Sequence, residues 1–360
     1  MGGAILNDVG NLIVNDCAFT NNSATMSGGA IFNNDNLNIS NSNFTNNFAT
    51  GYSGAVHNQD ILTVNNSNFI GNKAGNGAAL TNTAVGTMTV QSSAFTGNNA
   101  NANAIIANYG TTDFNFNRIA NNAVNSLTIG NGGTLNGEFN WWGDNNGPVG
   151  KISGLTVNKW MVLKLNALPS TFQSNSYSKV TADLRYDNTG TLHKSTYLPN
   201  GIQIIFKSTL GTFSSTTATI NGIAQTILRS VTLGSGNVTA KLDNQTMKTT
   251  VKIIDTIAPK VTSTTPKNNL INVPKTVIIT IKFSENFKTS TNFNNIVVKN
   301  LSTNKNLSLS RSISGNTLTI KTSTKNANTT YQVTIPKSAI KDYAGNNLSA
   351  TYTFKFKTGS

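Results

Sequence analysis

The 360-residue chain contains little cysteine, little charge and no long apolar run. Its single cysteine, Cys17, excludes an intrachain disulfide framework. No apolar run reaches the roughly 18–20 residues that a membrane-spanning helix needs, so no membrane span is expected. The chain opens on Gly2-Gly3-Ala4-Ile5 without the features of an export signal. We therefore expect a piece of a longer surface protein, with its export signal, first coils and anchor outside this sequence.

Acidic residues are also scarce, 13 against 27 basic ones, and their distribution is uneven. Residues 1–150 contain two basic and seven acidic residues, a charge of −5, whereas residues 151–360 contain 25 basic and six acidic residues, a charge of +19. A basic half could contact an acidic polymer or surface. Lysine also protects exposed strand edges from aggregation, and we favour this second interpretation. No motif indicates a nucleic-acid partner.

The chain does contain a sequence repeat of about 25 residues, which occurs five times between residues 2 and 122. Each copy has a phenylalanine at one fixed position, with Ile119 in its place in the fifth copy, and an asparagine three residues later. These positions are Phe19, Phe44, Phe69 and Phe95, and Asn22, Asn47, Asn72, Asn98 and Asn122. A fixed period of 20–50 residues is typical of stacked-repeat architectures.

Within each copy, apolar and polar residues alternate, as in Leu37-Asn38-Ile39, which predicts strands rather than helices. The repeat therefore predicts an all-β, right-handed parallel β-helix with about 25 residues per coil, in which equivalent residues lie about 4.8 Å apart. The phenylalanines would form a core column and the asparagines an amide hydrogen-bond ladder. Cys17 aligns with Ser42, Ser67 and Ser93. We interpret it as a small residue of a serine column rather than a reactive thiol.

The expected domain order follows from where this period ends. The β-helix should span residues 1–150, with a closing Trp-Trp-Gly motif at 141–143. Trp141 and Trp142 suit a plug over the open core end, and a carbohydrate-stacking platform is the alternative. Residues 151–167 would form a connector strand. Short alternating strands and turn residues then predict two Ig-like β-sandwiches, at 168–254 and 255–360.

Several motifs resemble known surface proteins. The phrase Gly28-Gly29-Ala30-Ile31 followed by Asn41–Asn47 resembles β-helix repeats of outer-membrane and adhesin-like proteins, and Asn140–Pro148 looks like the closing motif of methanogen (archaeal) adhesin-like proteins. Residues 198–230 are similar to the invasin/intimin-type Ig-like domain. The last unit, with Ile340–Leu348, resembles the Ig-like domain of S-layer proteins. Together these resemblances imply an extracellular, cell-surface adhesin-like protein. They imply no particular ligand.

An enzyme is the competing hypothesis, because parallel β-helices also carry polysaccharide lyases, hydrolases and epimerases. Such chemistry needs clustered carboxylates on one outward face. The candidates are Asp35 and Asp60, which share one repeat position, together with His57. Two stacked carboxylates could also hold a cation. Aspartate is common in turns, however, and we favour that role.

Two further residues with chemical potential lie in the basic half. Glu285 is its only glutamate and could serve as the acid of a Lys–Asn isopeptide bond, although no spacing singles out such a pair. His193 is interpreted as a solvated side chain.

We therefore expect a β-helix displayed on an Ig-like stalk, with no enzyme activity and no cofactor. Its partner would be a cell-surface glycan or a protein of another cell. The alternatives are a polysaccharide-active enzyme and a ligandless S-layer or stalk protein.

Overall fold

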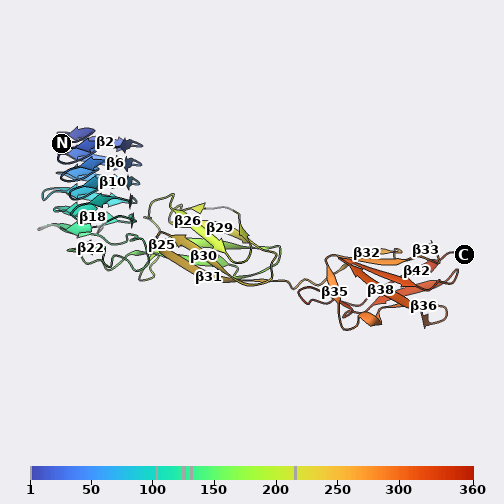
Figure 1. Cartoon of the computed structure of the whole chain (residues 1–360). Coiled ribbons are helices and arrows are strands. Elements are labelled where there is room, and N and C mark those ends of the chain that lie inside the picture. Colours follow the sequence, from blue (N-terminus) through green and yellow to red (C-terminus); the bar gives the residue numbers. More distant parts are fainter. Residues whose placement is uncertain (1, 103, 124–126, 130–132, 215–216) are drawn as a thin grey trace. The chain divides into compact units, whose positions relative to one another are not determined.

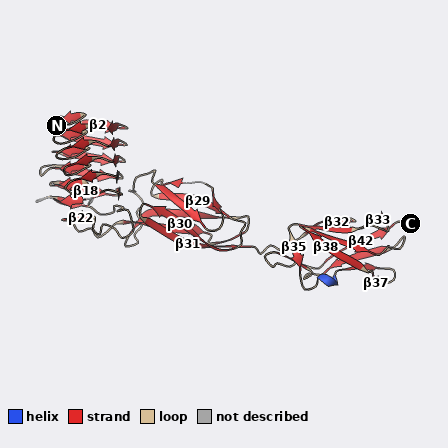
Figure 2. Ribbon diagram, in the orientation of Figure 1, coloured by secondary structure: helices blue, strands red, loops and turns tan. Residues whose placement is uncertain are grey.

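The structure is a computed structural model that describes residues 2–102, 104–123, 127–129, 133–214 and 217–360. The chain forms two compact units, Met1–Lys252 and Ile253–Ser360, and each is described by itself. Strands dominate both units (Figures 1 and 2). Among the described residues, the one helical element is a 3-10 turn, Phe293–Asn295. No helix in this part of the chain is long and apolar enough to cross a membrane.

The first part of the first unit is a parallel β-solenoid, which confirms the predicted β-helix. One sheet contains β1 (Ile5–Asn7), β5 (Ile31–Asn33), β9 (Val56–Asn58), β13 (Leu80–Asn82), β17 (Ile106–Asn108), β20 (Leu127–Ile129) and β22 (Ile152–Ser153). The second contains β2 (Leu12–Asn15), β6 (Asn36–Ser40), β10 (Ile61–Asn65), β14 (Thr87–Gln91), β18 (Thr111–Asn115) and β21 (Thr134–Asn136). The third contains β3 (Ala18–Thr20), β7 (Asn43–Thr45), β11 (Asn68–Ile70), β15 (Ala94–Thr96) and β19 (Arg118–Ala120), and the fourth β4 (Ser23–Ala24), β8 (Phe48–Ala49), β12 (Lys73–Ala74) and β16 (Asn99–Ala100).

Successive coils stack in the register that the repeat predicts. The rings of Phe19, Phe44, Phe69 and Phe95 form one file, with centroid spacings of 4.8, 4.9 and 4.8 Å and nearly parallel planes. Ile119 continues the column beside Phe95. Leucine, isoleucine, valine and methionine columns fill the rest of the core. No single repeat could bury this apolar face alone, so the coils stabilise one another through stacking.

Asparagine side chains form hydrogen-bonded ladders that join successive coils. In the predicted ladder, Asn47 donates from its backbone N and from Nδ2 to Oδ1 of Asn72, and Asn72 does the same to Asn98. A second buried ladder was not predicted. Its members are Asn7, Asn33, Asn58, Asn82 and Asn108, joined by amide-to-amide hydrogen bonds of 2.6–3.0 Å. Both ladders satisfy polar groups that would otherwise be buried without partners.

A first β-sandwich completes the first unit. One sheet has the order β23 (Met161–Leu168), β25 (Tyr177–Asp187), β29 (Ile223–Arg229) and β27 (Thr212–Phe213). The other has the order β24 (Thr171–Gln173), β31 (Gln245–Ile254), β30 (Gly234–Leu242), β26 (Gln203–Ser208) and β28 (Thr217–Ala218). β23, expected within a connector, pairs with β25, so the sandwich begins before residue 168.

The two tryptophans lie where the solenoid meets this sandwich. Trp142 packs in the solenoid core, whereas Trp141 belongs to the sandwich core. Trp141 Nε1 donates to the Asp243 carboxylate at 2.8 Å, and Asp243 also forms an ion pair with Arg118 of β19. The closing motif therefore joins two domains instead of merely covering a core.

The second unit is a second β-sandwich. Its larger sheets are β32 (Val261–Thr265), β34 (Ile279–Phe283), β39 (Thr317–Thr322) and β38 (Leu309–Ser314), and β33 (Leu270–Val273), β42 (Tyr352–Thr358), β40 (Thr330–Ile335), β36 (Val297–Asn300) and β37 (Lys305–Asn306). A small ribbon pairs β35 (Phe287–Thr289) with β41 (Ile340–Asp342). In β42, Phe354 and Phe356 are buried while Lys355 and Lys357 are exposed, as the alternation predicts.

Candidate functional site

The outer side of the β2-β6-β10-β14-β18-β21 sheet is the candidate functional site, and we call it the solenoid face. Successive strand residues point to opposite sides. Leu62 and Val64 of β10 therefore enter the core, and Thr63 between them faces outward. In-register pairing repeats this arrangement on each strand. The outward columns are Asn36, Ile61, Thr87, Thr111 and Thr134; Ile13, Asn38, Thr63, Thr89, Asp113 and Asn136; and Asn15, Ser40, Asn65, Gln91 and Asn115.

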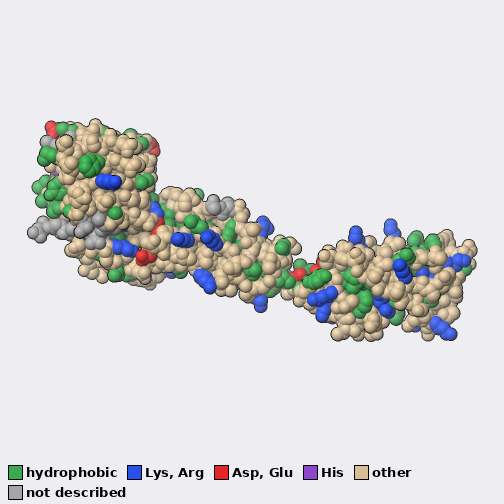
Figure 3. All heavy atoms as spheres, in the orientation of Figure 1, with side chains coloured by type: hydrophobic (Ala, Val, Ile, Leu, Met, Phe, Trp, Pro, Cys, Tyr) green, Lys and Arg blue, Asp and Glu red, His purple; other side chains and the backbone are tan. Residues whose placement is uncertain are grey.

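The solenoid face consists mainly of hydroxyls and amides. Among the described residues of the three columns, Asp113 alone carries a charge. Six strands at a spacing of about 4.8 Å, each about five residues long, give a face of about 24 by 13 Å. In the view of Figure 3 the lysines and arginines are spread mostly over the sandwiches, while the solenoid surface is largely uncharged. Such a face can offer hydrogen bonds that recur from rung to rung.

The structure places Asp35 and Asp60 in the turns that lead into β6 and β10. The Asp35 carboxylate accepts hydrogen bonds from the backbone N–H of Gly10 at 2.7 Å and of Asn36 at 2.8 Å. The backbone carbonyl oxygens of Asp35 and Asp60 accept hydrogen bonds from ladder asparagines. The Asp35 side chain thus holds its turn.

His57 lies on the outward side of β9 but is only 6% exposed. Its ring stacks on Phe32 at 4.8 Å and lies 6.2 Å from the Tyr52 ring. Burial lowers the pKa of His57 from 6.5 to about 4. Its Nδ1 atom finds no hydrogen-bond partner within the described ranges. These observations give His57 a packing role, and no ion pair joins it to Asp60 in the part of the chain that the structure describes.

Trp141 and Trp142 are 0% and 1% exposed. A sugar-stacking platform requires an accessible ring face, and neither indole offers one in this structure.

A different carboxylate group, absent from the sequence predictions, lies in the second unit. Asp255, Glu285 and Asp342 are the three acidic residues of 253–360, and their carboxylates come within 4.8 Å of one another. Burial, and the charges of Asp342 and Asp255, raise the pKa of Glu285. Asp342 accepts hydrogen bonds from the backbone N–H groups of Gly345 and Asn346. Oxygen donors of this kind are those that a divalent cation would use.

His193 differs from its predicted role as a solvated side chain. Its Nε2 lies 3.0 Å from the Asp187 carboxylate, and its ring contacts those of Phe116 and Phe139. The contacting rings come from the solenoid, more than 50 positions earlier in the chain, so local sequence could not reveal them. Hydrogen bonds from Thr189, His193 and the Thr191 backbone overcome burial and lower the pKa of Asp187 to about 2.

The family model described as "Bacterial Ig-like domain" matches residues 255–358, which form the second sandwich. No curated protein matches the chain.

Among solved structures, the adhesin InvE of Yersinia pseudotuberculosis is similar, with 15% identity over 54% of this chain and 58% of that one, and a TM-score of 0.30. A C-terminal 282-residue intimin fragment, solved with the intimin-binding domain of its translocated receptor, shares 18% identity over 54% and 63%, with a TM-score of 0.22. InvD of Yersinia pseudotuberculosis shares 15% identity over 54% and 57%, with a TM-score of 0.23.

The chain thus spans less than two thirds of the length of these three solved chains. Likenesses at such TM-scores define neither its fold nor its ligand. None of these matches supports the methanogen origin that the resemblance implied. The comparisons show that the second sandwich is similar to bacterial Ig-like domains.

Proposed function

We propose that the chain is part of an extracellular, cell-surface adhesin-like protein whose solenoid face binds a polysaccharide and whose Ig-like sandwiches act as a stalk. The observation that carries this proposal is the set of three outward columns, polar at every position except Ile13 and Ile61, on successive parallel strands. A polymer lying along the stack would meet a similar hydroxyl or amide on each rung. The match of residues 255–358 to a bacterial Ig-like domain supports a stalk role for that sandwich.

The composition and width of the solenoid face favour a glycan over a folded protein. A single polysaccharide chain needs only a strip about 13 Å wide, which is the length of the strands in this sheet. The low charge of the solenoid face also suits a ligand that is recognised through its hydroxyl groups.

The expected affinity is modest. Each hydrogen bond to a neutral group contributes about 1 kcal/mol net, because it replaces a bond to water. A glycan that makes about six such bonds gains roughly 6 kcal/mol before the cost of ordering its chain. Binding by one face would therefore be weak, with a Kd near the millimolar range. Adhesion then depends on many copies acting together on one surface.

The test is co-sedimentation of the 360-residue chain with a panel of insoluble cell-wall polysaccharides. The variant Thr63→Glu/Thr89→Glu places two bulky charges in the middle of the solenoid face. Its matched control is Thr45→Glu/Thr96→Glu, which alters half-buried threonines on the neighbouring sheet. We expect at least a tenfold loss of binding for the first variant and little change for the control.

Equal binding by both variants would contradict the proposed face. Assays for released sugars on the same panel separate binding from catalysis, because an enzyme would release products that Asp35→Asn/Asp60→Asn abolishes. Absence of binding to every polysaccharide would favour a ligandless stalk.

A further inference from the structure

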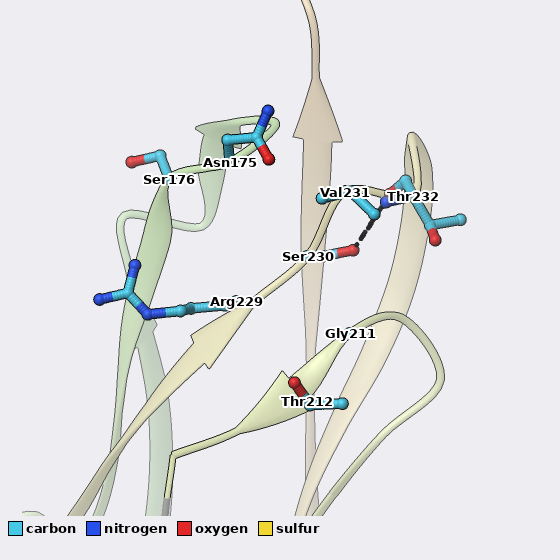
Figure 4. A pocket seen from close by; sticks show the side chains of 8 residues that line it. All are labelled: Asn175, Ser176, Gly211, Thr212, Arg229, Ser230, Val231 and Thr232. Carbon is cyan, nitrogen blue, oxygen red and sulfur yellow. Dashed lines mark hydrogen bonds between the residues drawn. The ribbon is translucent and has the colours of Figure 1, made fainter.

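A second candidate site lies at one end of the first sandwich, where three loops border an open cavity of about 340 Å³. The loops join β24 to β25, β26 to β27, and β29 to β30 (Figure 4). The cavity is lined by Asn175, Ser176, Gly211, Thr212, Arg229 and the turn 230–232. Its volume is near the lower end of the roughly 300–1,000 Å³ of small-molecule sites, which suits one sugar residue.

The backbone holds these loops close together. The N–H of Asn175 donates to the carbonyl of Ser230, and Ser230 Oγ accepts from the N–H of Thr232 at 3.0 Å. At Gly211, φ is 82° and an added Cβ would lie 2.1 Å from the Arg229 carbonyl oxygen, so only glycine allows this approach of β27 to β29. The cavity is thus bounded by tethered loops.

Arg229 of β29 is the middle residue of three that lie side by side on adjacent strands. It pairs in register with Tyr177 on β25 and with Thr212 on β27. Its guanidinium lies 5.3 Å from the centroid of the Tyr177 ring. Figure 4 shows the side chain extending on the side of Ser176 and away from Thr212 and the turn 230–232. Stacking on tyrosine limits the rotamers of the arginine, which lowers the entropy that ligand binding would cost.

No carboxylate of the sandwich is available to neutralise Arg229. The acidic residues of 161–252 are Asp183, Asp187 and Asp243, and they pair with Arg185, His193 and Arg118, respectively. Within the described residues, Arg229 takes part in no ion pair. Its positive charge therefore remains available to an external anion.

We propose that this cavity binds a carboxylated sugar residue, of the uronic acid type. The planar guanidinium of Arg229 matches a carboxylate with two parallel hydrogen bonds. The neutral side chains of Asn175 and Ser176, on the same side as the guanidinium, supply donors and acceptors for sugar hydroxyls. Phosphate is a poorer match, because Arg229 is the one cation among the residues that line the cavity. The site is separate from the solenoid face and does not depend on the function proposed for it.

The test is fluorescence polarisation with labelled trigalacturonate, using the full 360-residue chain. Arg229→Gln should weaken binding at least tenfold, and Tyr177→Leu should weaken it about two- to fivefold by freeing the arginine. Lys207→Gln is the matched control, because it removes one exposed positive charge from β26 of the same sandwich. Thr63→Glu/Thr89→Glu, on the solenoid face, should also leave this affinity unchanged.

Fully methyl-esterified trigalacturonate should fail to compete, and inorganic phosphate should compete poorly. The proposal is overturned if Arg229→Gln binds as the unmodified chain does, if Lys207→Gln causes an equal loss, or if the methyl ester competes equally well. Competition by phosphate at the same concentration as the sugar would assign the site to phosphate-bearing ligands instead. Thermal unfolding of each variant checks that the exposed substitutions leave the sandwich folded.

Discussion

Acidification should destabilise the solenoid through one side chain, His57. Its ring is buried and stacks on Phe32, and burial lowers its pKa from 6.5 to about 4. In the unfolded chain, His57 binds a proton as the pH falls below 6.5, whereas in the folded chain it stays neutral until about pH 4. The unfolded state therefore binds more protons across this interval, so the stability is complete above pH 6.5 and decreases as the pH falls.

The magnitude follows from the pKa difference. One pKa unit corresponds to about 1.4 kcal/mol, so the free energy of unfolding should fall by about 1.4 kcal/mol per pH unit and by on the order of 3 kcal/mol in total. Urea titrations at pH 7.5, 6.5, 5.5 and 4.5 measure this loss. Tryptophan fluorescence reports it, because Trp142 is 1% exposed in the solenoid core and becomes solvated on unfolding.

Two variants test whether His57 causes this pH dependence. His57→Phe should remove the pH dependence between pH 6.5 and 5, since Phe32 already occupies the same column one coil earlier. The chain has only two histidines, so His193→Gln is the control and should keep the dependence. If phenylalanine overpacks the site, His57→Gln supplies the same test. An equal loss of stability in wild type and His57→Phe would refute the reasoning.

Three further predictions concern other polar side chains. Asn72→Ala should lower the free energy of unfolding by about 3 kcal/mol in urea titrations, because it leaves the Asn47 amides without their acceptor, whereas exposed Asn99→Ala should change it little. Below pH 4 the chain should lose a further amount, on the order of 2 kcal/mol, as Asp187 is protonated between pH 3.8 and about 2, and calorimetry of Asp187→Asn should show no such loss. Glu285→Gln should stabilise the second unit at pH 7, because the raised pKa of Glu285 marks an unfavourable charge. Melting curves recorded with EDTA should show that this gain in stability disappears as the pH falls and Glu285 of the wild-type chain takes up a proton.

The regular part of the solenoid could be predicted because its stabilising contacts repeat with the sequence period. Phe44 and Phe69 are 25 residues apart and stack directly, so the spacing alone revealed the contact. The ladder through Asn33 and Asn58 recurs at the same interval. The Nδ2 atoms of Asn33 and Asn58 also donate to the backbone carbonyls of Asp35 and Asp60, so the ladder supports the turns that contain these aspartates.

Contacts without a period could not be predicted in this way. Trp141 reaches Asp243 across 102 positions, and only the folded sandwich shows that the two tryptophans belong to different cores. The row of Tyr177, Arg229 and Thr212 likewise arises from the pairing of three strands. The sequence contains every residue of these clusters, yet their proximity depends on strand order.

The central claim is that successive coils stack in a register of 23 to 26 residues and thereby align the solenoid face. Paired cysteines test it most directly in a Cys17→Ser background. Thr63 and Thr89 are register partners on β10 and β14, about 4.8 Å apart, which suits a disulfide, whereas Thr63 and Thr87 are diagonal neighbours about 8 Å apart. The account predicts that Thr63→Cys/Thr89→Cys oxidises readily and that Thr63→Cys/Thr87→Cys remains reduced. Equal oxidation of both pairs, or preference for the diagonal one, would contradict it.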